Sequence, residues 1–159
     1  MPSITLSSPL GNLTLTSNTR ALTALDFTPL APLSLASLDQ PVLRQGYEEL
    51  MAYFRGELHF FRTPCTPEGG TPFQREVWSA LQTIPFGECA SYKEIAQRIG
   101  RPRAMRAVGN ANNKNPLAIF IPCHRVIGAN GALVGYASGL DKKRFLLELE
   151  GYLPSSKSI

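Results

Sequence analysis

The sequence predicts two parts: an α/β N-terminal part and a mainly helical C-terminal part that contains a helix-turn-helix. Alternating apolar residues over 1–30 are followed by helical spacing from Pro41 onwards. Residues 63–72 hold three prolines and two glycines, which favours a linker. Further on, Gly100-Arg101-Pro102 separates two short helical patterns. We therefore expect an N-terminal domain over 1–66, a linker over 67–72, a C-terminal domain over 73–153 and a tail over 154–159.

In the N-terminal part the first elements expected are short strands. Ile4 and Leu6, then Leu13 and Leu15, alternate with more polar neighbours on either side of Gly11-Asn12, which is typical of a hairpin. After it we expect a Pro- and Ser-rich loop over 29–41, a helix from 41 to about 56 and a further strand over 58–61.

The C-terminal part reads as a series of helices. The first covers 73–84, with Trp78 on its buried side and Pro85-Phe86-Gly87 ending it. Ser91 and Glu94 form a capping box at the next helix start, and a second short helix covers 103–112. The last helix is expected to begin at the capping-box-like pair Ser138 and Asp141 and to end at Gly151.

Composition excludes several classes of protein. The 159 residues are 43% hydrophobic and 18% charged, without a membrane-spanning apolar run or a signal-peptide pattern, so a cytoplasmic protein is expected. The three cysteines have neither disulfide-framework nor zinc-ligand spacing, and no metal site is expected. Residues 1–70 carry four Lys/Arg and six Asp/Glu, whereas residues 71–159 carry twelve and six. The basic C-terminal half suits a polyanion such as DNA, although a solvated surface explains the charge equally well.

The motif Pro122-Cys123-His124-Arg125 carries the strongest chemical signal. It follows the apolar run 117–121, which predicts a strand with a thiol and an imidazole at its exit. A thiol becomes a good nucleophile as thiolate, and His124 is a candidate base that would act through water because adjacent side chains diverge. Alone, such a cysteine is more often an inert core residue. Glu150, at the end of the last helix, is a candidate carboxylate to orient His124.

Basic and small residues gather on the predicted helix-turn-helix. Cationic side chains suit phosphates, and small ones let a helix approach a groove closely, although they equally permit tight packing between helices. The basic residues that crowd this unit include Arg98, Arg101, Arg103, Arg106 and Lys114. We assign DNA contacts to Arg103, Ala104, Arg106, Ala107 and Lys114, and to Arg125 beside the thiol.

An ordered set of motifs over residues 73–153 extends this pattern. These are S-Y-x-x-I-A, R-A-V-G-N-A, N-P, I-P-C-H-R-V-I, G-x-x-x-G-Y and L-L-x-x-E-G. In this respect the chain resembles the O6-alkylguanine-DNA alkyltransferases. The resemblance implies a ribonuclease-H-like α/β N-terminal domain and a winged-helix-like C-terminal domain. It also implies minor-groove binding to duplex DNA, flipping of the damaged guanine and transfer of its O6-alkyl group to a cysteine.

The same resemblance implies roles for single residues. Cys123 would accept the alkyl group, His124 would be its base through water, and Glu150 would orient His124. Arg106 would replace the flipped base, Tyr92 would crowd the target phosphate and reach guanine N3, and Asn115 would tie the helix-turn-helix to the active-site turn. The Val126 and Cys123 carbonyls would read the guanine amino group, and Tyr136 would form a pocket wall. Ala137 and Ser138 depart from some relatives, which have a serine directly after this tyrosine. No hydroxyl at 137 can then serve the O6 atom, a backbone amide there could substitute, and Ser138 would shape the pocket entrance.

The expected activity is a single-turnover methylated-DNA–protein-cysteine methyltransferase, because no residue is placed to hydrolyse the thioether. It needs no cofactor, and the expected state is a monomer without membrane or obligate protein partner. The substrate is duplex DNA with O6-alkylguanine, and O4-alkylthymine is a second base to test. Two alternatives remain: an alkyltransferase-like protein that binds lesions without chemistry, whose members lack the cysteine, and a Cys/His hydrolase, which leaves Arg106 unexplained.

Overall fold

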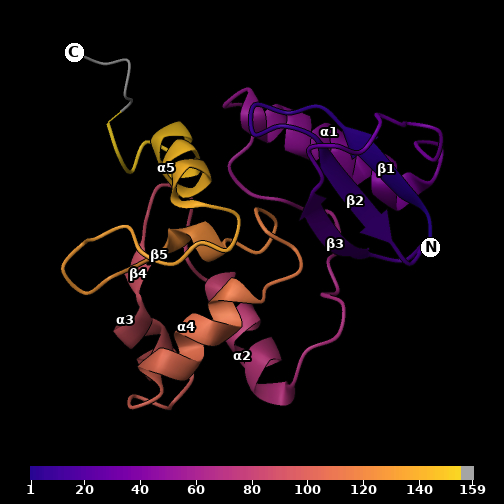
Figure 1. Ribbon diagram of the computed structural model, residues 1–159. Helices are drawn as coiled ribbons and strands as arrows, with labels where there is room; N and C mark the ends of the chain where they lie inside the picture. Colours follow the sequence, from indigo (N-terminus) through magenta and orange to yellow (C-terminus); the bar gives the residue numbers. More distant parts are fainter. Residues whose placement is uncertain (155–159) are drawn as a thin grey trace. The chain divides into compact units, whose positions relative to one another are not determined.

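The computed structural model describes residues 1–154 and divides the chain into two compact units (Figure 1). The first comprises residues 1–68 and 116–120, and the second comprises residues 69–115 with the chain from Ile121 onwards. Except for Pro154, the tail predicted over 154–159 lies outside the described residues.

The first unit is a three-stranded antiparallel sheet packed on one helix (Figure 1). The strands lie in the order β1 (Ser3–Leu6), β2 (Leu13–Ser17) and β3 (Leu22–Phe27), and the helix is α1 (Pro41–Phe54). The predicted hairpin is therefore present and gains a third strand. Close approach of helix and sheet requires Gly46, since a Cβ there would lie 2.9 Å from a methyl carbon of Leu22.

Two strands predicted from apolar runs are absent. Residues 58–61 form no strand, and Cys65 instead makes an isolated bridge to Leu22. The run 117–121 is buried, but it contains only isolated bridge residues, one of which pairs Leu117 with Leu25. Ile119 interrupts it with a φ of 75°, a conformation that a β-branched residue rarely adopts and that an extended strand cannot contain. The prediction of a strand leading into Cys123 was therefore wrong.

The second unit is mainly helical. Its helices are α2 (Pro72–Leu81), α3 (Tyr92–Arg98), α4 (Met105–Asn113) and α5 (Leu140–Leu149). A 3-10 turn, η1 (Cys123–Arg125), precedes β5 (Val126–Ile127), which pairs in parallel with β4 (Ala90–Ser91). In Figure 1, α2, α3 and α4 gather on one side of this strand pair and α5 lies on the other.

Capping boxes begin α2 and α3, whereas α4 and α5 begin without a side-chain cap. The Ser91 hydroxyl accepts from the Glu94 amide at 3.0 Å and the Glu94 carboxylate accepts from the Ser91 amide at 3.2 Å, so the predicted capping box is confirmed. Trp78 is buried as predicted, and its indole N–H donates to the Ala111 carbonyl at 2.8 Å, joining α2 to α4. The cap predicted at Ser138 was wrong, because α5 begins after Gly139 without a side-chain cap.

Candidate active site

Cys123 lies at the start of η1, and the chain before this turn is held from α4. The Asn115 side chain, two residues beyond α4, donates to the Ile121 carbonyl at 2.8 Å. The Asn112 side chain donates to the Cys123 carbonyl at 3.3 Å. The end of α4 is thereby tied to the backbone that carries the thiol, which is 5% exposed.

Beside the thiol, three charged or titratable side chains form a buried cluster. His124 Nε2 lies 2.7 Å from Glu150 Oε2. The Arg125 guanidinium donates to both Glu150 oxygens, at 2.8 and 3.0 Å, and to the Ile84 carbonyl at 2.7 Å. The predicted contact between His124 and Glu150 is thus present, and the carboxylate is shared with a bidentate arginine.

These contacts decide the charge states of the cluster. Burial by itself raises the pKa of Glu150, but the hydrogen bonds from His124 and Arg125, together with the positive charge of Arg125, outweigh it and hold this pKa well below the usual range. Burial lowers the pKa of His124, and the bond to Glu150 only partly opposes this. Glu150 is therefore an anion and His124 a neutral imidazole near pH 7.

Neutral His124 has one ring nitrogen available as a base. Because the Glu150 carboxylate can only accept, we assign the ring proton to Nε2, which leaves the lone pair on Nδ1. Nδ1 is buried and has no hydrogen-bond partner within residues 1–154. An oriented imidazole with a free lone pair is the arrangement that proton abstraction requires.

The Cys123 thiol itself is protonated at rest. Burial raises its pKa to about 11, while a hydrogen bond from Asn115 and the charge of Lys143 act in the opposite direction. A buried thiol of this kind needs a base to become nucleophilic. The neighbouring His124, a neutral imidazole with an unpaired Nδ1, can serve as that base.

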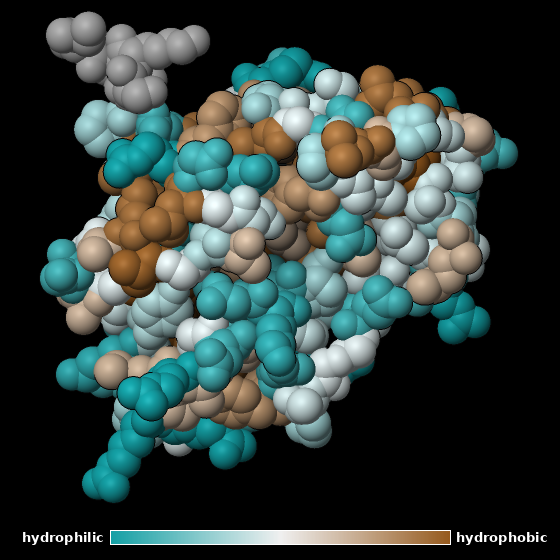
Figure 2. Space-filling view, in the orientation of Figure 1, coloured by the Kyte–Doolittle hydropathy of each residue, from teal (hydrophilic) through white to brown (hydrophobic). Residues whose placement is uncertain are grey.

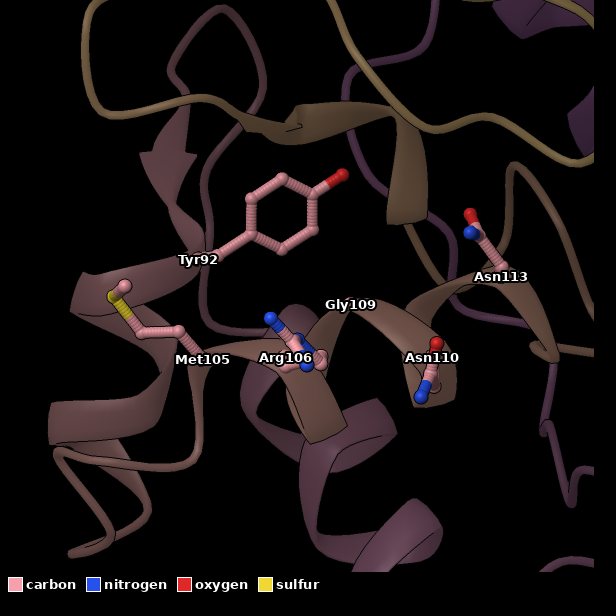
Figure 3. A pocket seen from close by; sticks show the side chains of 6 residues that line it. All are labelled: Tyr92, Met105, Arg106, Gly109, Asn110 and Asn113. Atoms are coloured by element: carbon pink, nitrogen blue, oxygen red, sulfur yellow. The ribbon is translucent and has the colours of Figure 1, made fainter.

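In the same unit, Tyr92 lies between α4 and the loop after β5 (Figure 3). Its ring lies over Gly109, where an added Cβ would be 3.7 Å from the ring edge, and its hydroxyl donates to the Val134 carbonyl at 3.0 Å. A surface hollow of about 420 Å³ opens here. It is lined by Tyr92 from α3 and by Met105, Arg106, Gly109, Asn110 and Asn113 from α4.

Most residues predicted to contact DNA lie on the surface around α4. Arg103, Arg106, Ala107 and Lys114 are exposed, and Ala104 is half-buried before the first turn. Figure 2 shows hydrophilic side chains over this part of the second unit. Arg98 and Arg101, which the sequence grouped with them, instead contact Thr83 and Glu76 on the side of α2.

Arg125 was predicted to contact DNA, and its position in the structure contradicts that role. The residue is 7% exposed, and its guanidinium donors are engaged by Glu150 and Ile84. A guanidinium turned into the interior cannot neutralise a phosphate. The guanidinium of Arg125 instead holds the Glu150 carboxylate in one orientation through two hydrogen bonds.

The predicted pocket residues follow η1 along the chain. Val126 is fully buried in β5, and Tyr136 is nearly so, with a hydroxyl that lacks a partner among the described residues. Burial raises the pKa of Tyr136 well above its usual value, and the nearby Cys123 adds to this. Ala137 is exposed and Ser138 half-buried.

Two further polar residues at the site were missed from the sequence. Lys143 is fully buried, and its ammonium donates to the Val126 and Val134 carbonyls. Its position was a signal, because Lys143, Leu146 and Leu147 share one face of a helix, where a lysine is unusual. Asn112 offered no such signal, since it falls among the small residues of α4.

Two family models together account for nearly the whole chain. The DNA-binding domain of 6-O-methylguanine DNA methyltransferase matches residues 72–152, and the ribonuclease-like domain of the same enzyme matches residues 3–67. The chain belongs to the 6-O-methylguanine DNA methyltransferase family.

Individual members of the family are similar over almost the full length. A methylated-DNA–protein-cysteine methyltransferase of Methanosarcina barkeri is 51% identical over 149 residues, covering 91% of this chain and 94% of the relative. One from Mycolicibacterium paratuberculosis is 50% identical, covering 92% and 90%. Among solved structures, Mycobacterium tuberculosis OGT in complex with DNA is 45% identical with a TM-score of 0.83, covering 94% of this chain and 92% of that one.

Proposed function

We infer that this chain repairs DNA by moving the alkyl group of O6-alkylguanine in a duplex onto Cys123. The inference depends on three buried side chains that lie in series: Cys123, neutral His124 with an unpaired Nδ1, and ionised Glu150. Family membership supports it, since close relatives bear the name of this methyltransferase.

The reaction uses the groups in that order. The Cys123 thiol passes its proton through water to His124 Nδ1, while Glu150 stabilises the imidazolium that forms. The thiolate attacks the alkyl carbon, so that a sulfur–carbon bond forms as the bond from carbon to O6 breaks. The electron pair and the proton leave with the base, which becomes guanine. Because a thioether is stable, each molecule acts once and no cofactor is consumed.

Access to the thiol requires the guanine to leave the duplex. Extrusion costs a few kcal/mol, and a side chain that fills the gap offsets part of this cost. Arg106 is exposed beside the hollow on α4 and is proposed to take the place of the base. Tyr92 is proposed to crowd the target phosphate, and Arg103, Ala104, Ala107 and Lys114 to contact the backbone of the minor groove.

The pocket for the extruded guanine is proposed to lie between η1 and the loop that follows β5. The carbonyls of Cys123 and Val126 would accept from the guanine amino group, and Tyr136 would form a wall. With alanine at 137, a backbone amide there would serve O6, and Ser138 would shape the entrance. Asn115 would keep the turn in register with α4, as its bond to Ile121 supports.

Several finer features belong to the same proposal. The first unit is taken as a ribonuclease-H-like domain over 1–66, followed by a linker over 67–72, and the second as a winged-helix-like domain over 73–153. The protein is proposed to act in the cytoplasm as a monomer, without an obligate protein partner. No helix within residues 1–154 is long and apolar enough to cross a membrane.

The test is a single-turnover assay with equimolar protein and an O6-methylguanine duplex. We expect the intact protein to gain one methyl group and peptide mapping to place it on Cys123. An unmodified duplex is the control. Methylation of another residue, or many turnovers per protein, contradicts the proposal. Lesion binding without transfer would indicate a sensor, and DNA-free thioester cleavage a hydrolase.

A further inference from the structure

Lys143 is the most unusual side chain of the second unit that the proposed chemistry leaves unused. It is 0% exposed, although lysine is almost never fully buried without a partner. Burial lowers its pKa to about 8, so that near pH 7 most molecules still carry the charge inside the protein. A buried ammonium is costly unless its donors are satisfied, so the partners of Lys143 indicate what the residue does.

The two acceptors come from segments on either side of the proposed pocket. The ammonium donates to the Val126 carbonyl in β5, directly after η1, and at 2.7 Å to the Val134 carbonyl in the loop after β5. Val134 also accepts from the Tyr92 hydroxyl at 3.0 Å. One lysine on α5 therefore joins the active-site turn to the loop, and the loop in turn is joined to α3.

We propose that Lys143 is a positioning residue for recognition of the guanine, because it fixes the Val126 carbonyl that accepts from the guanine amino group and holds the 128–139 loop against it. This rests on the proposed function. A carbonyl has two lone pairs, so Val126 can accept from Lys143 and from the base together. The lysine keeps the carbonyl at one angle before the base arrives, which reduces the ordering cost of binding.

The electrostatic surroundings agree with this position. The titratable groups coupled to Lys143 are Cys123 of η1, Cys89 before β4 and His124. Its charge opposes the effect of burial on the Cys123 thiol. The two hydrogen-bonded carbonyls hold the ammonium in this position.

The test compares two duplexes that differ in one amino group. One carries O6-methylguanine and the other O6-methylhypoxanthine, which lacks the exocyclic amine at the same position. Single-turnover transfer rates are measured for wild type, Lys143→Met, and Arg144→Met as the matched control, since Arg144 is the next residue of α5 and is exposed. Lys143→Gln, which keeps a donor, is the second variant.

We expect Lys143→Met to lower the rate of transfer from O6-methylguanine about fivefold or more, because the Val126 carbonyl would no longer be fixed for its hydrogen bond to the guanine amino group. The rate with O6-methylhypoxanthine, which lacks that amino group, should fall much less. Arg144→Met should match wild type on both. The inference would be overturned if Lys143→Met lost the same factor in rate on both duplexes, or if wild type reacted with both at the same rate. Failure of both Lys143 variants to fold would overturn it as well. If wild type transfers nothing from either duplex, the proposed function itself fails.

Discussion

The second unit uses its charged side chains in two opposite ways. In the interior, His124 and Arg125 each bond to Glu150 at 2.7 to 3.0 Å, and all three side chains are almost completely shielded from water. On the surface around α4, Arg103 and Arg106 are exposed and form no ion pair with any described residue.

This difference indicates that the buried charges serve the reaction and the exposed charges serve DNA binding. A buried, fully bonded cluster holds one geometry and one protonation state, which suits the orientation of a base. Exposed cations without partners remain free to exchange water and counterions for phosphates, and their effect is screened by salt. Changes in the interior should therefore alter reaction and stability, whereas changes on the surface should alter DNA association and its salt dependence.

The largest expected effect is that of Cys123→Ala, which should abolish alkyl transfer and leave DNA affinity close to wild type. The thiol is 5% exposed and adds little to any contact surface. Intact mass after exposure to an O6-methylguanine duplex and a binding titration measure the two properties. Residual methylation of the variant would show that another residue accepts the group.

The second largest effect is expected from breaking the buried ion pair of Arg125 and Glu150. Arg125→Met should lower the free energy of unfolding by about 3 to 5 kcal/mol, because Glu150 would remain as a buried charge without its bidentate arginine partner. Arg101→Met is the control, since its pair with Glu76 is exposed and should contribute about 1 kcal/mol or less. Urea unfolding measures both. Equal destabilisation by the two substitutions would remove the contrast between interior and surface.

On the surface, Arg106→Ala should slow alkyl transfer from duplex DNA about tenfold, because unstacking the base costs a few kcal/mol and the arginine offsets part of it. Overall affinity should fall less, and the slope of log affinity against log salt should decrease by about 1 if the cation also contacts phosphate. Arg20→Ala, an exposed cation of the first unit, is the control for net charge. Equal transfer rates for wild type and Arg106→Ala would reject this role.

The smallest effect expected is the pH dependence of stability. His124 has a lowered pKa in the folded state, so the unfolded chain binds the extra proton first and stability falls as pH drops below about 6.5. Glu150 also has a lowered pKa, and its contribution is lost as pH falls below about 4.3. Urea unfolding at pH 7.5, 6 and 5 should show stability falling with pH, and the fall should be smaller in His124→Gln. Stability that increases over this range on acidification would contradict the assigned charge states.

Features encoded within a few residues were predictable from the sequence. The capping box of Ser91 and Glu94 depends on four consecutive positions, and burial of Trp78 follows from helical spacing around it. Apolar runs were less informative, since burial does not distinguish a strand from an irregular segment. The strand predicted over 117–121 was wrong because Ile119 turns the buried chain. The strand predicted over 58–61 was wrong because that segment is irregular and largely exposed, with Phe60 63% exposed.

The amino-acid sequence was enough to identify the candidate nucleophile and its neighbouring base, because Cys123 and His124 are adjacent and their chemistry is intrinsic to their side chains. The protonation state of His124, the inward turn of Arg125 and the burial of Lys143 follow from three-dimensional packing. These properties depend on partners distant in the chain: 25 positions separate Arg125 from Glu150, and 17 separate Lys143 from Val126. Whether a charge meets water, a phosphate or a buried carbonyl is decided by packing, which local sequence patterns do not encode.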